Sequence, residues 1–520
     1  MTLLQNRRLL KLLILIVLVT CGILIGVSHK QRIEKEKTEK LRAVSQKFNW
    51  TVDEKDPTLV YTDIGGNIVH PSRLYRANFS NAAEDDPKYN FKSFNCLVED
   101  WNKVHTDQLP NAELHEKWMK KNVSRKNYLY HTTPSPLAAF VHEDHITVTL
   151  TAENMFGQKV YCRYYDCNRR EIPDLFEAVV FPESTVFCGR RIGAKYISVS
   201  TAPDSVPEPA VPLHKRLGGL QHYLTVCMAT VYGEEPKFAQ IVDFIEYHKL
   251  QGATFFHIYF RNSSAYDRML LDDYVRTGEV EVIVMNDHYW RADFMWHMMQ
   301  ISDCHMRSKN FSKWTALLDI DERIEMRQDW RIVDYLDTVT NPNIINLQFS
   351  VQWVLKDVWS PAQFENDTHF VDNLVFRRFH NTSRVANYWV QPKCIIRPEK
   401  IGAMTIHFPH SVYKGFLETL VNKTVGVVRH YRNVDGGALL NNNQRAFEYA
   451  PYRMTSINPT VEERLTKACL SRVKLVYDTV NYNCDMIQAM YHEHGLMHEC
   501  YLKQVEEEHK ALQQNQTISV

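Results

Sequence analysis

The chain has 520 residues, 44% of them hydrophobic, so it is long enough for two or three domains with cores of their own. Lysine and arginine together number 61, as do aspartate and glutamate. A chain without net charge has no overall field that would favour nucleic acid or a strongly acidic partner, so the informative charges are local.

The first informative feature is an uncharged apolar segment from Leu12 to Ser28, which follows Arg7, Arg8 and Lys11. As a helix it would be about 25 Å long, enough to cross a thin bilayer. A cleaved signal peptide is the alternative, but the segment is long for one and no A-x-A site follows it. We therefore predict a cytoplasmic tail (1–11), a transmembrane signal-anchor helix (12–28) and a stem (29–47).

Sequons and cysteines indicate which side of the membrane the body occupies. All nine N-x-[ST] sequons follow the apolar segment, as do ten of the eleven cysteines. Glycosylation and disulfides both belong to the secretory lumen. The pattern predicts a single-pass type II protein of the Golgi or another secretory-pathway membrane. We expect glycans at Asn49, Asn78, Asn122, Asn310, Asn366, Asn381, Asn422 and Asn515.

Residues 48–202 are predicted to combine an irregular segment with a small β-rich domain. From Leu137 onwards, short β-branched and aromatic runs alternate with turn residues, which is typical of an antiparallel β-sandwich. Cys162 and Cys188 lie within or beside these runs and are one candidate disulfide. Four prolines within ten residues then predict a stiff linker over 203–221. The predicted strands are His145–Leu150, Lys159–Tyr164, Glu177–Phe181 and Lys195–Ser200.

A second domain is predicted over 222–508. Its first run, Tyr223–Thr230, is continuously apolar, as is typical of a strand covered on both faces. Helical and strand patterns then alternate, which predicts an α/β fold with a parallel sheet and right-handed crossovers. The predicted elements are helices at Phe238–Leu250, Tyr266–Arg276 and Phe294–Lys309, and strands at Phe255–Phe260, Val280–Met285 and Trp314–Leu318, with Gly252 and Gly278 ending the first two helices.

The last of these strands ends in Asp319-Ile320-Asp321-Glu322. Alternation along the strand would place both aspartates on one side and turn Ile320 towards the core. Adjacent carboxylates repel, and a divalent cation removes that cost; their oxygens suit Mg²⁺ or Mn²⁺. The alternative is a solvated acidic turn. The position at the carboxyl end of a strand in an open α/β sheet favours ligand binding.

The remainder of the chain is predicted to hold one more strand and three helices. The strand Ile344–Leu355 is followed by Asp357 and Glu365 in a stretch rich in aromatic residues, which commonly stack on sugar rings or form ordinary core. Residues 509–520 are predicted to be disordered. The helices are expected at Gln444–Tyr449, Thr460–Tyr477 and Cys484–Glu508, with Cys469, Cys484 and Cys500 available for disulfides.

Several motifs, taken in order, resemble glycosyltransferase family 92, a group of nucleotide-sugar enzymes with the GT-A fold. The resemblance covers about Tyr223 to Cys500 and includes Glu234 or Glu235, which look like the family's N-E element. One departure is Arg261-Asn262, where the family often has D-N. The other matching segments are Phe244–Ala253, Phe256–Ser264, Tyr274–Gly278, Gln300–Cys304, Lys313–Glu322, Lys393–Pro398, Ile406–Pro409 and His430–Arg432.

The resemblance implies a GT-A-like site in which Mn²⁺ or Mg²⁺ bridges the donor diphosphate to the protein. Asp321 is then the expected metal ligand, Asp319 contacts metal or ribose, and either His407 or His430 is a third ligand. Lys393, Arg397 and Arg432 are expected to contact the diphosphate, with surface charges as the alternative. The nucleotide-sugar contacts are expected from Thr230, Tyr232, Glu235, Asn262, Asp319, Lys393, Arg397 and Arg432.

The activity implied by the resemblance is inverting transfer of galactose from UDP-galactose, giving a β-linkage to a glycan. A single displacement needs one carboxylate to deprotonate the acceptor hydroxyl, and the candidates are Asp357 and Glu365. If the Asn262 loop lines the nucleotide cleft, a glycan there would obstruct binding, so we expect that sequon to be unoccupied.

Two other functions are compatible with parts of this sequence. A haloacid-dehalogenase-type phosphatase also uses D-x-D at a strand end, but it needs Thr or Val where this chain has Arg323. A lumenal or surface glycan-binding protein with the same fold and no turnover is the stronger rival. The intact D-x-D, both histidines and Lys393 argue for the transferase. The acceptor glycan stays open, because a few contacts decide such specificity.

Overall fold

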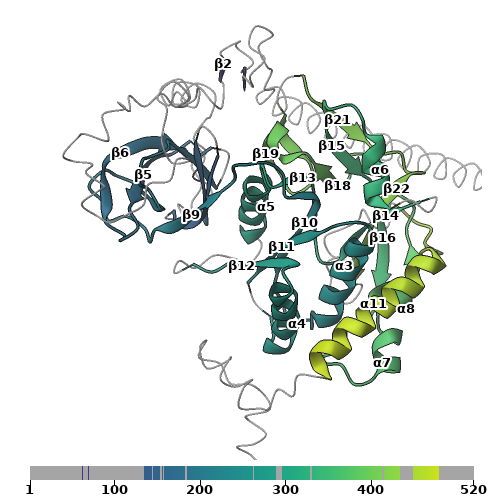
Figure 1. Ribbon diagram of the computed structural model, residues 1–520. Helices are drawn as coiled ribbons and strands as arrows, with labels where there is room; N and C mark the ends of the chain where they lie inside the picture. The colour runs from purple at the N-terminus through teal and green to yellow at the C-terminus, as the bar shows by residue number, and fades with distance from the viewer. Residues whose placement is uncertain are drawn as a thin grey trace, which may run out of the picture.

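The computed structural model describes residues 61–62, 68–69 and 134–478, except for 143–144, 153–154, 156, 182–183, 262, 288–294, 328–330, 413–414 and 434–448 (Figure 1). The predicted tail, signal-anchor helix and stem lie outside these residues, as do the predicted helix Cys484–Glu508 and the final segment 509–520. Among the described residues, no helix is both long and apolar enough to span a bilayer. A short antiparallel pair, β1 (Tyr61–Thr62) and β2 (Ile68–Val69), precedes the main body.

The N-terminal domain is a seven-stranded sheet in the order β6-β5-β8-β9-β3-β4-β7. β3 and β9 pair in parallel, whereas the other neighbours pair antiparallel. Figure 1 shows the sheet curled around its interior. Its strands are β3 (Pro136–Val141), β4 (Ile146–Leu150), β5 (Lys159–Tyr165), β6 (Glu171–Val179), β7 (Thr185–Cys188), β8 (Tyr196–Ser200) and β9 (Val211–Lys215).

This curled sheet corrects the predicted β-sandwich. The two edge strands meet at a bridge between Val180 and Val186, so one sheet curls back on itself instead of two sheets packing face to face. Register shifts between Cys162 and Tyr164 and between Pro136 and Ala138 mark irregularities of the kind that bend strands. The strand pattern in the sequence predicts which residues are buried, but closure depends on long-range register that no local pattern contains.

Two further features of this domain bear on the predictions. The disulfide Cys162–Cys188 is present, as expected. The segment 203–221, predicted as a linker, contributes β9, which pairs with β8 and β3. Only the residues after Lys215 connect the curled sheet to the next domain without belonging to a strand of either.

The second domain contains the predicted alternation of strands and helices, and this prediction is confirmed. β10, β11, β12 and β13 are parallel and lie side by side in the order β12-β11-β10-β13. The elements are β10 (His222–Val231), α3 (Phe238–Leu250), β11 (Phe255–Phe260), α4 (Ala265–Arg276), β12 (Val280–Val284), α5 (Met295–Ser308) and β13 (Ser312–Leu318).

One carboxylate helps to start two of these helices. Ser264 and Asp267 form a capping box at the beginning of α4, in which each side chain accepts a backbone N–H of the other residue. The same carboxylate accepts the backbone N–H groups of Lys237 and Phe238 at 2.8 and 2.7 Å. Because the first amides of a helix lack partners within it, Asp267 joins the starts of α3 and α4.

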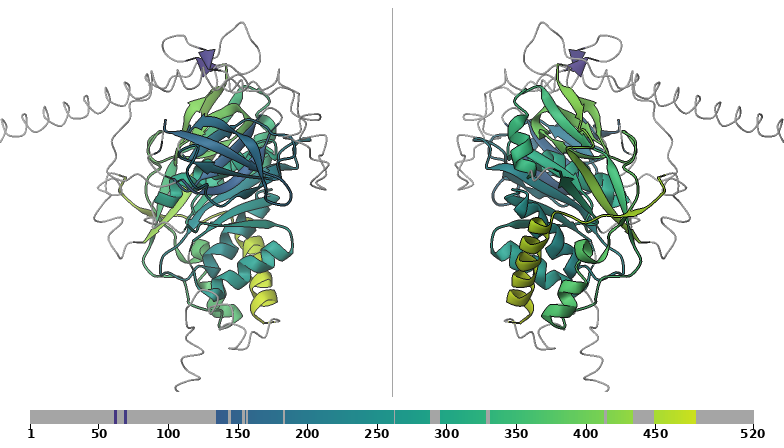
Figure 2. Two further views of the ribbon diagram at one scale, coloured as in Figure 1. Left: turned by 90° about the vertical axis from the view of Figure 1, so that its left-hand side faces the viewer. Right: turned by 90° about the vertical axis from the view of Figure 1, so that its right-hand side faces the viewer.

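Two sheets share the remaining strands. The sheet that holds the four parallel strands continues beyond β13 with β18, β15 and β21, where β18 pairs antiparallel with both neighbours, and a second sheet has the order β14-β22-β16-β17-β23. The helix α11 packs against α3 and α4, as Figure 2 also shows. The added elements are β14 (Glu322–Met326), α6 (Ile332–Thr338), β15 (Ile344–Phe349), β16 (Val351–Lys356), α7 (Asp367–Asp372), α8 (Val375–Arg378), β17 (Asn381–Thr382), β18 (Lys393–Ile396), β19 (Ile401–Met404), β20 (Pro409–Val412), β21 (Leu417–Leu420), β22 (Gly426–Asn433), β23 (Arg453–Met454) and α11 (Pro459–Tyr477).

The predicted strand Ile344–Leu355 is in fact two strands. β15 belongs to the sheet that contains β10 and β13, and β16 belongs to the second sheet, with Ser350 between them. A continuous apolar run does not show a change of sheet, because both halves are buried. Residues 444–448 of another predicted helix lie outside the described residues, and Tyr449 is in a turn.

The helix α5 connects the two domains. The Thr149 hydroxyl of β4 donates to Asp303, whose other carboxylate oxygen accepts from Tyr259 Oη at 2.6 Å and from Arg307 Nε at 2.9 Å. Met306 of the same helix is fully buried in the core of the curled sheet. A disulfide between Cys227 and Cys304 also links α5 to β10. The helix is therefore held by both domains.

A matched pair of glycines tests how tightly the second domain is packed. Gly252 and Gly278 both have left-handed φ angles, +98° and +75°. A Cβ on Gly252 would overlap the methyl groups of Val333 in α6, whereas a Cβ on Gly278 would meet nothing within 4 Å. We expect Gly278→Ala to lower the free energy of unfolding by about 1 kcal/mol and Gly252→Ala by about 2–4 kcal/mol, because overpacking adds to backbone strain.

Denaturant titration of both variants measures the difference. Adding Val333→Ala to Gly252→Ala should recover part of its excess loss, since the overlapping methyl groups are removed. Equal losses for the two glycine variants would mean that α6 moves aside without cost.

Candidate functional site

A cavity of about 310 Å³ lies at the carboxyl ends of β10 and β13. This is the edge at which open α/β sheets bind ligands. Of the residues predicted to contact metal or nucleotide sugar, Thr230, Tyr232, Glu235, Asp319, Asp321 and Arg432 line it. The other lining residues are Ala229, Val231, Lys237, Gln240, His297, Ile320, Lys356 and Tyr431.

The two aspartates lie on a turn, which corrects the predicted strand geometry. β13 ends at Leu318 and β14 begins at Glu322, so the motif connects the two sheets instead of extending one strand. The Glu322 N–H donates to the Asp319 carbonyl at 3.0 Å, and the Asp319 N–H donates to Glu322 Oε2 at 2.9 Å. Ile320 is partly buried against the core, as predicted. The turn leaves both aspartates at the cavity.

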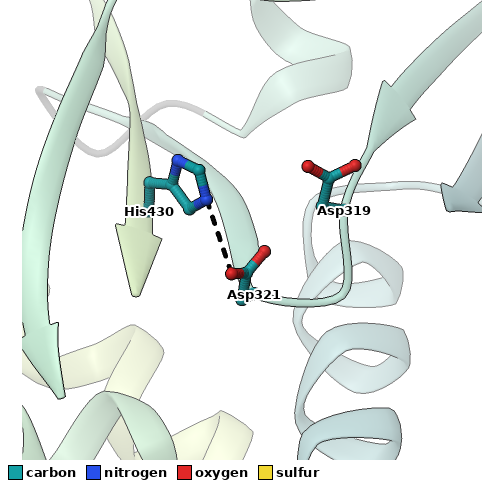
Figure 3. Close-up of side chains that lie close together, drawn as sticks. All are labelled: Asp319, Asp321 and His430. Carbon is teal, nitrogen blue, oxygen red and sulfur yellow. Dashed lines mark ion pairs between the residues drawn. The ribbon is translucent and has the colours of Figure 1, made fainter. Parts of the chain in front are cut away.

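The strand β22 brings a histidine to this turn. Glu322 of β14 lies opposite His430 of β22, and the Tyr431 N–H donates to the Asp321 carbonyl at 2.8 Å. His430 Nε2 is 3.4 Å from Asp321 Oδ2, the ion pair drawn in Figure 3. Ligand atoms of Asp319, Asp321 and His430 all lie within 4.8 Å of one another. We call these three residues the acid–histidine cluster.

Of the two histidines left open by the sequence, the structure brings only His430 into this cluster. His407 Nδ1 lies 3.2 Å from the Pro392 carbonyl oxygen. Burial and Lys393 lower the pKa of His407 to about 4. Both histidines end apolar runs in the sequence, so only the pairing of β22 with β14 separates them.

Basic side chains surround the two aspartates. Lys393 Nζ is 3.0 Å from Asp319 Oδ2, and His297 Nε2 is 3.2 Å from Asp319 Oδ1. Arg432 Nη1 is 3.3 Å from Asp321 Oδ2. Burial raises the pKa of Asp319, but Lys393 and His297 outweigh it and hold that pKa well below its ordinary value.

The neighbouring acids show the same competition with different results. Burial also raises the pKa of Asp321, but Arg432 and His430 outweigh it, so the net shift is downwards. Glu322 behaves differently: burial and the charge of Asp319 raise its pKa above the ordinary value. Both aspartates are therefore ionised at neutral pH, the state in which carboxylates bind cations.

The cluster fits a divalent cation. Asp319 Oδ1 and His430 Nε2 are buried and make no hydrogen bond, although His297 Nε2 and Asp321 Oδ2 lie 3.2 and 3.4 Å away from them, respectively; buried polar atoms are normally hydrogen-bonded. Two carboxylates and an imidazole are a donor set that suits Mn²⁺, and Mg²⁺ accepts the oxygens. A cation here would be held by Asp319, Asp321 and His430.

Two of the predicted diphosphate contacts, Lys393 and Arg397, lie at opposite ends of β18. Lys393 begins β18 beside the cluster, but its side chain is 2% exposed and also contacts Glu322 Oε2 at 3.1 Å. Arg397 follows the other end of β18, about 13 Å further along. Its guanidinium donates to the carbonyls of Pro342 and Val339 and covers the Trp314 ring. The structure therefore places Arg397 at the opposite edge of the sheet.

The two candidate bases lie outside the cavity lining. Asp357 is exposed and directly follows Lys356, which does line the cavity. Glu365 is 55% exposed and lies 3.7 Å from His369 Nδ1. Asn262, the remaining predicted nucleotide contact, is outside the described residues.

Some lining residues were missed by sequence reasoning. His297 lies in α5 and Lys237 directly precedes α3, positions at which a polar residue has no distinguishing local signal. Lys356 pairs with Glu235, which also accepts the Ser360 N–H at 2.9 Å. Burial raises the pKa of Glu235, but Lys356 outweighs it and lowers that pKa. Only the fold brings these residues together.

Four of the predicted glycosylation sites are described. Asn366 and Asn422 are exposed, whereas Asn310 and Asn381 are partly buried. The Asn310 amide donates to the Arg216 carbonyl at 3.3 Å. Glycosylation stays a prediction, and Asn49, Asn78, Asn122 and Asn515 lie outside the described residues.

The pairing of Lys393 predicts a large stability effect. Replacing Lys393 by Met leaves Asp319 and Glu322 without their shared counter-ion, and breaking such a buried pair costs about 3–5 kcal/mol. Lys313→Met is the control, because that lysine is exposed at the start of β13 and its loss should cost under about 1 kcal/mol. Denaturant unfolding without metal measures both. Equal stability of the two variants would contradict the assignment of Lys393 as counter-ion.

Comparison with known proteins identifies the domain that carries this site. The family model for Glycosyltransferase family 92 matches residues 222–473, from β10 into α11. No curated protein shows significant similarity to the chain. The solved structure of HddC from Yersinia pseudotuberculosis is 12% identical over 48% of this chain and 99% of its own, with a TM-score of 0.21, which supports no conclusion. The match confirms the resemblance seen in the motifs: the domain over residues 222–473 matches glycosyltransferase family 92.

Proposed function

We propose that the protein is a metal-dependent glycosyltransferase that transfers a hexose from a nucleotide-diphosphate sugar to a glycan. Glycosyltransferase activity follows from the family. The finer proposal is inverting transfer of galactose from UDP-galactose, with Mn²⁺ or Mg²⁺ as cofactor. The observation that carries it is the acid–histidine cluster beside a cavity at the carboxyl ends of two parallel strands.

The cavity supplies groups for each part of such a donor. Thr230, Tyr232 and Glu235 line it on the β10 side, where the nucleoside would lie. Arg432, with a side chain 40% exposed, is available to the diphosphate, whereas Lys393 remains the buried counter-ion of the acids. When bound, the cation neutralises the diphosphate and stabilises its departure.

The transfer itself is a single displacement. The acceptor hydroxyl oxygen forms a bond to the anomeric carbon, the bond from that carbon to the diphosphate oxygen breaks, and its electron pair leaves with the diphosphate. The hydroxyl proton passes to a carboxylate. We propose Asp357 for this role because it is exposed and adjoins cavity-lining Lys356, whereas Glu365 is paired with His369.

The proposed setting is a Golgi or other secretory-pathway membrane, with residues 12–28 as the anchor and the catalytic domain in the lumen. Two observations support it. The described residues contain the disulfides Cys162–Cys188 and Cys227–Cys304, which form in oxidising compartments. All nine sequons follow the apolar segment.

Asp321→Asn tests the metal-dependent donor site. This change keeps the size of the side chain and removes a charged ligand, so Mn²⁺-dependent binding of UDP to the full-length chain should weaken about 100-fold. Calorimetry with and without Mn²⁺ measures it. Asp272→Asn is the control, because Asp272 is 43% exposed on α4 and pairs with Arg268.

Two results would change the proposal. Wild-type protein that binds no nucleotide diphosphate in the presence of Mn²⁺ would contradict it. Binding without transfer, from any nucleotide sugar to any glycan of an array, would favour the alternative of a glycan-binding protein without turnover.

Asp357→Asn tests the proposed base. Losing general-base catalysis should lower kcat by about 10²- to 10⁴-fold, while Mn²⁺-dependent UDP binding stays unchanged. Glu365→Gln should keep nearly wild-type kcat. Steady-state kinetics with the acceptor found on the array measures both. A larger loss for Glu365→Gln than for Asp357→Asn would reverse the assignment.

A further inference from the structure

Glu322 is a fully buried carboxylate at the beginning of β14, directly after the turn that carries Asp319 and Asp321. Its side chain does not form part of the cavity wall, yet its carboxylate lies beside two other acids. Burying such a charge is unfavourable unless the surroundings pair it, so its contacts indicate what it does.

The two oxygens of Glu322 have separate partners. Oε2 accepts the Asp319 backbone N–H at 2.9 Å and lies 3.1 Å from Lys393 Nζ. Oε1 lies 3.3 Å from His430 Nδ1, and both atoms are buried without a hydrogen bond in this geometry. A single carboxylate therefore touches the acid turn, the start of β18 and the middle of β22.

The contact with His430 concerns the nitrogen that faces away from the cluster. His430 Nε2 faces Asp321 Oδ2 at 3.4 Å, and Nδ1 faces Glu322. A neutral imidazole carries its proton on one nitrogen only and binds a metal through the other. A carboxylate that accepts the Nδ1 proton keeps Nε2 free for a cation, and such partners are usual for metal-bound histidines.

The backbone reinforces this arrangement. Glu322 and His430 lie directly opposite each other in the antiparallel pairing of β14 with β22. Lys393 Nζ lies between this carboxylate and Asp319, so replacing Glu322 would leave Lys393 beside Asp319 alone, where it would compete with a cation. Glu322 thus acts on two of the three members of the acid–histidine cluster.

We propose that Glu322 is a positioning residue that holds His430 with Nδ1 protonated and Nε2 directed to a divalent cation bound by Asp319 and Asp321. This inference rests on the metal site of the proposed function. It assigns to the fourth residue of the D-x-D-E motif a role distinct from those of the two aspartates, because Glu322 does not line the cavity.

Glu322→Gln should weaken Mn²⁺ binding about 10- to 100-fold, the usual cost of losing such a partner. Electron paramagnetic resonance of free Mn²⁺, titrated into the full-length chain without nucleotide, measures the affinity. The matched control is Glu325→Gln. Glu325 lies on the same strand and pairs with Arg429, away from the cluster, so its variant should bind Mn²⁺ like wild type.

A second measurement tests the histidine without any metal. In ¹⁵N spectra of the histidine-labelled chain, with His430 assigned by comparison with His430→Gln, the wild-type ring should be protonated at Nδ1. Glu322→Gln should shift the population towards the other tautomer. This measurement on wild type decides the inference even if Glu322→Gln does not fold.

Two outcomes would overturn the inference: unchanged Mn²⁺ affinity in folded Glu322→Gln, or a wild-type His430 protonated at Nε2. If wild type binds no Mn²⁺ but His430 is protonated at Nδ1, the metal of the proposed function fails while the pairing of Glu322 with His430 stands. The two failures are therefore distinguishable.

Discussion

Mutual repulsion among three carboxylates within four residues is the constraint on which the rest of this site depends. Asp319, Asp321 and Glu322 meet at one turn, and Glu322 is fully buried. Their compensation comes from far along the chain: Lys393 from β18, and His430 and Arg432 from β22. Asp319 and Asp321 still present negative charge to the cavity, and a bound cation would neutralise it.

The turn itself belongs to two sheets. β13 is the fourth parallel strand of one sheet, and β14 is the edge strand of the other. The position of Asp319 is therefore set by the first sheet, whereas the positions of Asp321 and His430 are set by the second sheet. The three members keep their spacing only as long as the sheets keep theirs, and Lys393 and Glu322 form an ion pair across that junction.

Local patterns predicted much of this fold and part of the site. The helix Phe238–Leu250 was predicted with the bounds that the structure has, because its apolar spacing and the glycine after it are both local signals. The parallel strands followed from uninterrupted apolar runs. The aspartate pair was recognisable for the same reason, since both residues lie in one short motif.

What could not be predicted depends on register between distant strands. Nothing near His407 or His430 shows which of them faces the aspartates; the pairing of Glu322 with His430 does. The sequence suggested Arg397 as a phosphate ligand. Because β18 runs antiparallel to β13, Arg397 instead lies at the edge of the sheet opposite the cavity. The curled N-terminal sheet and the division at Ser350 could not be predicted for the same reason. An apolar pattern shows that a strand is buried, but it does not show which strand pairs with it.

The packing of α5 against the curled sheet determines which residues form one cooperative folding unit. The family domain is matched from residue 222, yet Met306 within it completes the core of the curled sheet, and Asp303 is shared with Thr149 of that sheet. A fragment cut at the family boundary would expose an apolar side chain and deprive a buried carboxylate of a donor. The borders of sequence similarity and of cooperative folding therefore differ here, and the smaller domain belongs to the scaffold of the larger one.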